Sequence, residues 1–383
     1  MKKVLFILYL VLPAILFSQP SDITPEIRER MASVISHTGK QPVDNFMLYL
    51  RHGSEGVTIH ESVGTLDYKG DSISPNYQYN VASITKTMVA TVILQLKEEG
   101  KLALSDPIGN YLSAISYLRF EDLHNFEGNA YAKDITIYHL LRHQSGLGDI
   151  FLDTQTRFNI SVLFHKKRMY SPKRIMDTFF KYKLHQKTHF KPGEGSYYTD
   201  INFLLLGLII EQVTGGSLPQ QIRERILEPL EMEYTYFEYY EPTVPGEGRI
   251  TAFLNRIQIT HKINTSYEWG GGGIVSTVAD MGRFIEGLFE GLLLKEPETL
   301  EEMINMTPNE PYGHAYGLGI YKFSIGEDIF YGHGGFYGSI LLYNPEKKIT
   351  ISANVNQANT PFDVEGILVD LLEITSQSNK DEG

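Results

Sequence analysis

Residues 80–90, NVASITKTMVA, place a serine and a lysine three positions apart at the start of an apolar run. The run continues to Gly100 through three charged residues, and its apolar positions recur at helical spacing, at Met88, Val89, Val92, Ile93 and Leu96. Glycine commonly follows the last helical turn. The sequence therefore predicts a helix from Ser83 to Gly100, with the side chains of Ser83 and Lys86 one turn apart on one face.

This pair has a chemical and a structural interpretation. A serine hydroxyl becomes a strong nucleophile when a neighbouring base takes its proton, and a lysine among apolar residues can do so or support another base. The backbone N–H of Ser83, at a helix N-terminus, would also face a developing oxyanion. In the structural interpretation, Ser83 caps the helix and Lys86 is a surface charge. The pair alone leaves both open.

The surrounding sequence predicts a mixed α/β (α+β) fold. Strand patterns occupy residues 46–62 and 315–355, a terminal helix follows near residues 362–372, and helical segments fill most of residues 101–250. We expect one antiparallel sheet flanked by helices, with a mostly helical inserted subdomain and a cleft between the two parts. Residues 19–383 then form one catalytic domain, with a sheet subdomain over about 25–100 and 255–383 and a helical subdomain over about 101–254.

The N-terminus resembles an export signal. Lys2 and Lys3 precede an apolar stretch, Val4–Phe17, which is shorter than the ~20 residues of a membrane-spanning helix. The sequence predicts a signal peptide over residues 1–18, with a retained membrane anchor as the alternative. After cleavage we expect no stable membrane insertion and a periplasmic or secreted protein.

Composition excludes several classes of function. The chain has 383 residues and no cysteine, so it has no disulfide, thiolate metal site or cysteine nucleophile. A net charge of −12 disfavours nucleic acid as a partner. Residues 165–191 are nevertheless basic and rich in aromatics. We interpret them as a solvated cover with buried aromatic rings, and a binding patch for an anionic polymer is the alternative.

Two further stretches carry candidate chemistry. Residues 191–207, KPGEGSYYTDINFLLLG, place Tyr198 and Asp200 after a Pro-Gly turn and before an apolar helix. A tyrosine can shuttle protons when nearby cations lower its pKa, although such a turn is also typical of a packed loop. Residues 330–339, FYGHGGFYGS, place His333, Gly334 and Gly335 in a strand pattern. Glycine weakens a strand, so it suggests close approach of another group there, for instance the substrate.

Together the three stretches resemble the penicillin-recognising serine hydrolases, which include class C β-lactamases, D,D-peptidases, D-aminopeptidases and related esterases. That superfamily combines S-x-x-K, Y-x-N and K-T-G or H-x-G motifs, matched in order here by S-I-T-K (83–86), Y-T-D (198–200) and H-G-G (333–335). The segments LLRHQSGLGD before residue 150 and GGGGIVSTVADMGRF (270–284) also look like the family. The resemblance covers roughly residues 45–360 and implies a β-lactamase/transpeptidase-like fold.

The resemblance also implies roles for individual residues. Ser83 would be the acyl-accepting nucleophile, Lys86 its proton partner and Tyr198 the general base and then acid. The oxyanion hole would comprise the backbone N–H groups of Ser83 and Phe336. Asp200, His333 and Gly335 would lie on the substrate side of the cleft. No metal or cofactor is implied.

This sequence departs from the family pattern at two places. Asp200 replaces the usual asparagine, and a carboxylate there would favour a charged Lys86 and raise the pKa of Tyr198. Which of the two acts as the base is therefore open. His333 and Gly334 replace lysine and threonine, which removes a charge and a hydroxyl that grip a substrate carboxylate. H-x-G is the form found among D-aminopeptidase-like and esterase-like members.

Rival enzyme classes lack their signatures. No serine lies in G-x-S-x-G, and no histidine lies in H-E-x-x-H. His185 and His189 are spaced as metal ligands, but they lie in a lysine-rich stretch and are better interpreted as surface histidines. His143 is better interpreted as a structural residue at a helix end than as a catalyst.

The sequence thus predicts an exported serine hydrolase that forms an acyl-enzyme with an amide or ester, such as a D-amino-acid peptide or a small ester. The alternatives are a β-lactamase or D,D-carboxypeptidase, and a non-catalytic module that binds peptidoglycan or peptides. Expected partners are small-molecule or peptide substrates, including cell-wall peptides.

Overall fold

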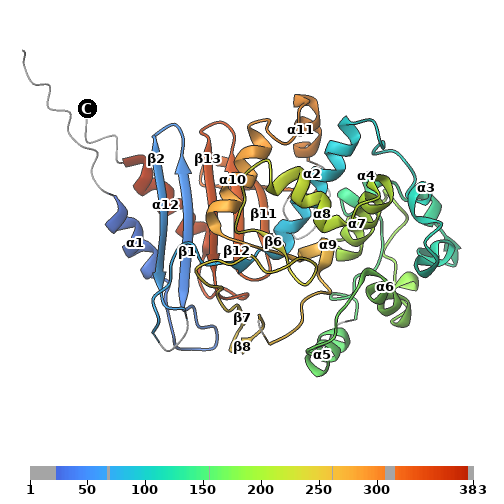
Figure 1. Cartoon of the computed structure of the whole chain (residues 1–383), viewed down its shortest axis with the longest axis horizontal. Coiled ribbons are helices and arrows are strands. Elements are labelled where there is room, and N and C mark those ends of the chain that lie inside the picture. The colour runs from blue at the N-terminus through green and yellow to red at the C-terminus, as the bar shows by residue number, and fades with distance from the viewer. Residues whose placement is uncertain (1–22, 67–69, 155, 261, 307–314, 378–383) are drawn as a thin grey trace, which may run out of the picture.

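A computed structural model describes residues 23–66, 70–154, 156–260, 262–306 and 315–377. The expected signal peptide lies outside these ranges. Figure 1 shows a sheet covered by helices on one side of the molecule and a largely helical part on the other. No single helix within the described ranges is long and apolar enough to cross a membrane, although Asp200–Thr214 together with Leu218–Leu227, bent by 80°, passes on length and composition.

The central sheet has six strands in the order β10-β11-β12-β13-β1-β2, and each neighbouring pair is antiparallel. Its strands come from both ends of the chain, as the sequence predicted. They are β1 (Asn45–His52), β2 (Val57–Gly64), β10 (Tyr321–Ile325), β11 (Asp328–Gly335), β12 (Ser339–Asn344) and β13 (Ile349–Val355). The predicted strand over residues 315–325 therefore begins only at Tyr321.

Helices cover both faces of this sheet because successive side chains of a strand point to opposite sides. In β1, Phe46, Leu48 and Leu50 pack in the core beneath α1 (Thr24–Ala32) and α12 (Val364–Gln377). Met47 and Tyr49 face the other core, beneath α10 (Val278–Phe289). A Cβ at Gly282 would lie 2.5 Å from the Tyr49 ring, so glycine lets α10 approach the sheet.

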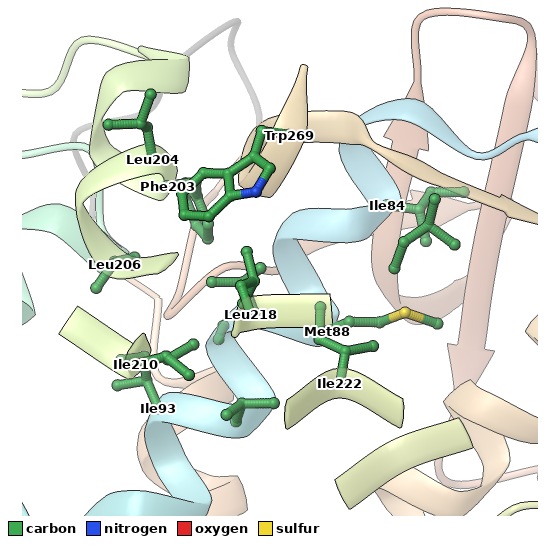
Figure 2. Close-up of a cluster of buried hydrophobic side chains, with 14 of the residues drawn as sticks. Ile84, Met88, Ile93, Phe203, Leu204, Leu206, Ile210, Leu218, Ile222 and Trp269 are labelled. Atoms are coloured by element: carbon green, nitrogen blue, oxygen red, sulfur yellow. The ribbon is translucent and has the colours of Figure 1, made fainter. Parts of the chain in front are cut away.

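The helical part is built around α2 (Thr85–Glu98) and α7 (Asp200–Thr214), which pack against each other. Ile201 to Ile210 are all buried, which explains why this helix is apolar on every side. Figure 2 shows side chains of α2 and α7 meeting Trp269 and two residues of α8 (Leu218–Ile222). As predicted, α2 ends just before Gly100, which adopts a left-handed φ of 67°.

Shorter elements complete this part. The helices are α3 (Gly109–Leu112), α4 (Ile137–Leu141), α5 (Thr156–Phe164), α6 (Pro172–Lys181), α9 (Trp269–Gly272) and α11 (Pro297–Ile304). A three-stranded sheet has the order β3-β9-β6, formed by Tyr79–Asn80, Ile274–Ser276 and Tyr236–Phe237. Two hairpins pair β4 (Asn125–Phe126) with β5 (Asn129–Ala130) and β7 (Phe253–Leu254) with β8 (Ile257–Gln258).

The helix predicted from Ser83 begins later in the structure. Ser83 does not lie in the α-helix itself but in a 3₁₀ turn, Ala82–Ile84, that connects β3 to α2. Within the basic segment 165–191, α6 buries Ile175, Met176 and Phe179 and exposes Lys173 and Lys181. This agrees with a solvated cover over buried apolar side chains.

Candidate active site

Ser83 and Lys86 meet at the junction of the sheet and the helical part. The Lys86 Nζ donates to Ser83 Oγ over 3.0 Å, so the contact expected from their spacing is present. Lys86 is fully buried, whereas Ser83 is partly exposed. The structural interpretation of this pair required Lys86 to be a surface charge. Its burial contradicts that interpretation.

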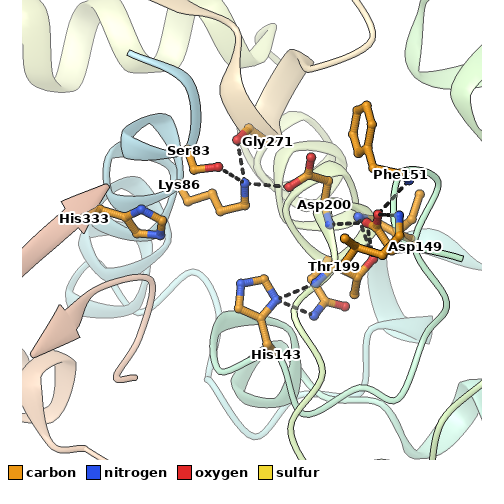
Figure 3. A network of polar contacts seen from close by, with 12 residues as sticks. Ser83, Lys86, His143, Asp149, Phe151, Thr199, Asp200, Gly271 and His333 are labelled. Atoms are coloured by element: carbon orange, nitrogen blue, oxygen red, sulfur yellow. Dashed lines mark hydrogen bonds and ion pairs between the residues drawn. The ribbon is translucent and has the colours of Figure 1, made fainter. Parts of the chain in front are cut away.

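Lys86 makes two more polar contacts, which Figure 3 shows around its ammonium group. Its Nζ donates to the Gly271 carbonyl oxygen over 2.7 Å and lies 2.6 Å from Asp200 Oδ1. Two hydrogen bonds and one ion pair therefore surround the Lys86 Nζ. A buried charge needs such compensation, because leaving it unpaired costs several kcal/mol, roughly 3–5 in measured cases.

The turn that carries Ser83 is held in an unusual backbone conformation. Ala82 has a φ of 49°, which costs on the order of 1–3 kcal/mol for a residue with a side chain. A Cβ at Gly335 would lie 2.2 Å from both the Val81 carbonyl oxygen and Ser339 Oγ. The close approach that glycine suggested is thus made within the protein, where β11 packs on the serine turn. Gly334 differs, since its Cβ would meet nothing nearer than 4.0 Å.

Tyr198 lies just before α7 and is positioned from one side by His143. The two rings have centroids 4.2 Å apart with planes 32° from parallel. His143 Nδ1 accepts the Thr199 backbone N–H over 3.2 Å and lies 3.2 Å from Asn202 Nδ2. Burial holds the pKa of His143 well below its usual value, so the ring is neutral. These contacts agree with a structural role for His143. The Lys86 Nζ lies 4.9 Å from the centroid of the Tyr198 ring.

A second carboxylate, the buried Asp149, supports this segment. Asp149 accepts the Asp200 backbone N–H over 2.8 Å and the Thr199 hydroxyl over 3.0 Å. It also accepts the backbone N–H groups of Phe151 and Leu152. Burial raises the pKa of Asp149 to about 6, and the nearby Asp200 adds to the effect. Asp149 therefore ties the loop after it to the start of α7 (Figure 3).

His333 is buried behind the site. It is 2% exposed, and its Nε2 lies 3.4 Å from the Tyr316 hydroxyl. Burial, with a smaller contribution from Lys86, lowers the pKa of His333 to about 3, so the ring carries no charge near neutral pH. Neither His333 nor Gly335 is among the residues that line the cavity above Ser83.

That cavity has a volume of about 430 Å³, and Ser83, Tyr198, Asp200 and Phe336 line it. Phe336 directly follows β11, which brings it beside the serine turn. Most of the wall is apolar, from Phe151, Leu152, Val162, Leu163, Leu254, Ile257, Ile259, Ile263 and Tyr267. Three carboxylates line the cavity, those of Asp149, Asp200 and Glu268, but no lysine, arginine or histidine among the described residues does.

Glu268, Gly271 and Gly272 line another part of the cavity wall. The Glu268 Oε1 accepts the Tyr337 hydroxyl hydrogen bond, and burial raises the pKa of Glu268 to about 8. A Cβ at Gly271 would lie 3.2 Å from Asp200 Cγ, and one at Gly270 would lie 2.8 Å from the Phe203 carbonyl oxygen. These glycines let α9 press against α7, which places the Gly271 carbonyl on Lys86.

Sequence reasoning identified the serine, lysine, tyrosine and aspartate that the structure brings together. It missed Asp149, Glu268 and the Gly271 carbonyl. Two of these lie in or beside segments that already looked like the family, since LLRHQSGLGD ends at Asp149 and GGGGIVSTVADMGRF begins at Gly270. Nothing in the sequence marked Glu268 as buried.

Metal ligation finds no support within the described residues, where no group of three or more His, Asp or Glu side chains is arranged to hold an ion. His189 lies 3.2 Å from Asp153 and stacks on Tyr197, with ring centroids 3.4 Å apart. It therefore contributes to packing at the surface.

Comparisons with known proteins identify a matching family model and several similar proteins. The model of the Beta-lactamase family matches residues 31–373. Teichoic acid D-alanine hydrolase of Staphylococcus aureus is 24% identical over 321 residues, covering 79% of this chain and 72% of that protein.

Solved structures confirm the predicted β-lactamase/transpeptidase-like fold. A D-stereospecific amidohydrolase from Streptomyces sp. matches with a TM-score of 0.74 and 24% identity, over 89% of this chain and 97% of the other. The D-amino acid amidase from Ochrobactrum anthropi SV3, complexed with L-phenylalanine, matches with a TM-score of 0.74 and 22% identity, over 94% and 99%.

Proposed function

Since this chain belongs to the Beta-lactamase family, we propose that it is an exported serine hydrolase that cleaves an amide or ester of a D-amino acid through an acyl-enzyme on Ser83. The observation that carries this proposal is the hydrogen bond from buried Lys86 to Ser83 at a cavity that has carboxylates but no basic side chain.

The polar contacts support a division of roles in acylation. Ser83 Oγ attacks the substrate carbonyl, and the oxyanion is stabilised by the backbone N–H groups of Ser83 and Phe336. Lys86 already makes two hydrogen bonds and one ion pair, so we assign it the stabilisation of negative charge on Ser83 and Tyr198. Tyr198 takes the serine proton and passes it to the leaving amine or alcohol. Water then attacks the carbonyl of the acyl-enzyme, and Tyr198 takes the proton of the water and returns it to Ser83 Oγ as the acid is released.

The lining of the cavity supports the substrate class. A β-lactam or a C-terminal D-alanyl peptide presents a carboxylate, which needs a cation, and His333 is buried and neutral. A substrate with a free amino group instead suits a cavity whose wall carries Asp149 and Asp200 and no cation, while Glu268, whose pKa burial raises to about 8, offers a neutral hydrogen-bonding group. The names of the relatives agree, since they describe a D-alanine hydrolase, a D-stereospecific amidohydrolase and a D-amino acid amidase.

Location and partners follow from the same proposal. A signal peptide over residues 1–18 would deliver the enzyme to the periplasm or the exterior, where D-amino-acid amides and esters of the cell wall, and cell-wall peptides, are available.

A fluorophosphonate probe tests the nucleophile. We expect it to label the parent at Ser83, and Ser83→Ala to abolish both labelling and hydrolysis. Ser113→Ala, at an exposed serine directly after α3, is the matched control and keeps both. Hydrolysis that survives in Ser83→Ala would refute the proposal.

A substrate panel tests the specificity. It comprises a D-alanine anilide, a D-alanyl ester, a p-nitrophenyl ester, a D-alanyl-D-alanine peptide and a chromogenic cephalosporin. We expect the first two to give the highest kcat/KM. Faster turnover of the cephalosporin or the dipeptide would identify the alternative activities, and stable peptide binding without turnover would identify a binding module.

A further inference from the structure

Exposed apolar side chains gather around the mouth of the cavity. Leu152, Leu163, Ile257 and Phe336 line it and are 41% to 54% exposed. Ile160 and Phe164 share one face of α5 with Leu163, Met169 follows five residues beyond that helix, and Phe164 is 82% exposed. Seven of the ten exposed large hydrophobic side chains in the described part of the chain therefore lie at the cavity mouth or in the segment 160–169 next to it, and together they are called the rim. Apolar gathering of this kind marks an interaction surface.

Positive charge accompanies the apolar rim. Residues 156–169, TRFNISVLFHKKRM, contain four basic residues and no acidic one, although the whole chain has a net charge of −12. Lys166, Lys167 and Arg168 are exposed, and no salt bridge to either lysine occurs within the described residues. The local charge is therefore opposite to that of the rest of the protein.

The segment is fixed to the wall of the cavity. The Asn264 backbone N–H donates to the Lys166 carbonyl oxygen over 2.9 Å, and the Tyr170 N–H donates to Ser266 Oγ over 2.8 Å. Figure 1 shows α5 projecting from the lower edge of the molecule near the β7–β8 hairpin, which carries Ile257. Apolar and basic side chains thus share one edge, onto which the cavity opens.

We propose that this rim docks on the surface of a lipid bilayer that contains anionic lipids. Apolar side chains enter the interface between headgroups and acyl chains, and lysines next to them attract the anionic headgroups. A soluble anionic polymer would match the lysines but would give no reason for Phe164 to face solvent. The acidic surface of a second copy of this chain would match the charge. That second copy, however, would still expose its own apolar rim to water.

The consequence for the cavity rests on the proposed function. With the rim on a bilayer, the mouth above Ser83 faces the headgroup layer, so the D-aminoacyl substrate belongs to a molecule anchored in, or lying on, that membrane.

Tryptophan fluorescence tests the docking. The only native tryptophan, Trp269, is 2% exposed, so an indole introduced by Phe164→Trp reports on the rim. We expect its emission to move to shorter wavelength on phosphatidylglycerol vesicles and to be quenched by brominated acyl chains. Leu292→Trp is the matched control, because Leu292 is 58% exposed but does not line the cavity, and its emission stays unchanged.

The charge is tested separately in the Phe164→Trp background. Adding Lys166→Ala and Lys167→Ala weakens vesicle binding roughly 30-fold, since each lysine at an anionic surface strengthens binding about fivefold. An unchanged emission on anionic vesicles would overturn the proposal, as would equal binding to phosphatidylcholine vesicles. Saturable binding to soluble polyphosphate without quenching by brominated lipid would identify an anionic polymer instead and would also overturn it.

These readouts do not depend on turnover. A failure of docking leaves the labelling of Ser83 unaffected, and a failure of labelling leaves the emission of the rim unaffected, so the two proposals fail separately.

Discussion

Glu268 provides a direct test of the electrostatics of the cavity. Burial raises its pKa from 4.5 to about 8, with contributions from Glu238 and Asp200, whereas the Tyr337 hydrogen bond and Lys86 act in the opposite direction. Between these two values the folded chain holds a proton that the unfolded chain has lost. The free energy of unfolding therefore falls as pH rises, by about 1.4 kcal/mol for each pH unit, and levels off above about pH 8.

The informative window is pH 6.5 to 8. Histidines whose pKa burial lowers, such as His333 with its pKa of about 3, change stability mainly below about pH 7, and Asp149 changes it mainly below about pH 6. Both contributions cancel in the difference between the parent and Glu268→Gln. Across the remaining 1.5 units the Glu268 carboxyl contributes a loss of about 2 kcal/mol. Glu268→Gln keeps a neutral side chain of similar size and removes this loss.

The assay is urea unfolding at pH 6.5 and pH 8, followed by the fluorescence of buried Trp269, the neighbour of Glu268. We expect the parent to lose about 2 kcal/mol more than Glu268→Gln between the two pH values. Glu298→Gln, at an exposed carboxylate on α11, should behave as the parent does. The same pH dependence in parent and Glu268→Gln would show that Glu268 is already ionised at neutral pH.

Two further substitutions probe the serine turn and its lysine. Gly335→Ala places a Cβ 2.2 Å from the Val81 carbonyl oxygen, so we expect a loss of roughly 1–3 kcal/mol in urea unfolding together with a lower kcat. Gly334→Ala, which enters open space, should change neither, and equal effects of the two would contradict the packing argument. Asp200→Asn removes the charge 2.6 Å from Lys86, so the pH–rate profile should move to lower pH and this shift should exceed the change in KM; an identical profile would show that the charge is not felt there.

The fold was predictable where local pattern decides structure. The spacing of Met88, Val89 and Leu96 indicates α2, because one face of a helix must be buried. Alternation and turn residues indicate β11 to β13. By contrast, the strand expected from residue 315 is shorter, since residues 315–320 form a bend and a bridge before β10.

The sequence indicated which residues form the site but not how deeply each of them is buried. The family resemblance implied that Ser83, Lys86, Tyr198 and Asp200 share one cleft, yet burial depends on contacts between distant segments. His333 illustrates this, because only the fold shows that its ring is enclosed beside Tyr316 and neutral. The apolar wall of the cavity likewise combines Phe151, Leu152 and α5 with side chains of the β7–β8 hairpin and the residues after it, and no local pattern reveals that these segments meet.

The run of glycines at residues 270–273 has a consequence for how such an enzyme acquires new substrates. Added Cβ atoms would lie within 3.2 Å of Phe203, Asp200, Glu268 or Phe237, so a substitution at any of these glycines must displace α7, Glu268 or Phe237. Leu152, Leu163 and Ile257, which line the cavity and are exposed to solvent, have no such restriction. We therefore expect substitutions that alter specificity, in nature or in a directed library, to occur at these exposed positions, while the residues around the glycine run stay the same.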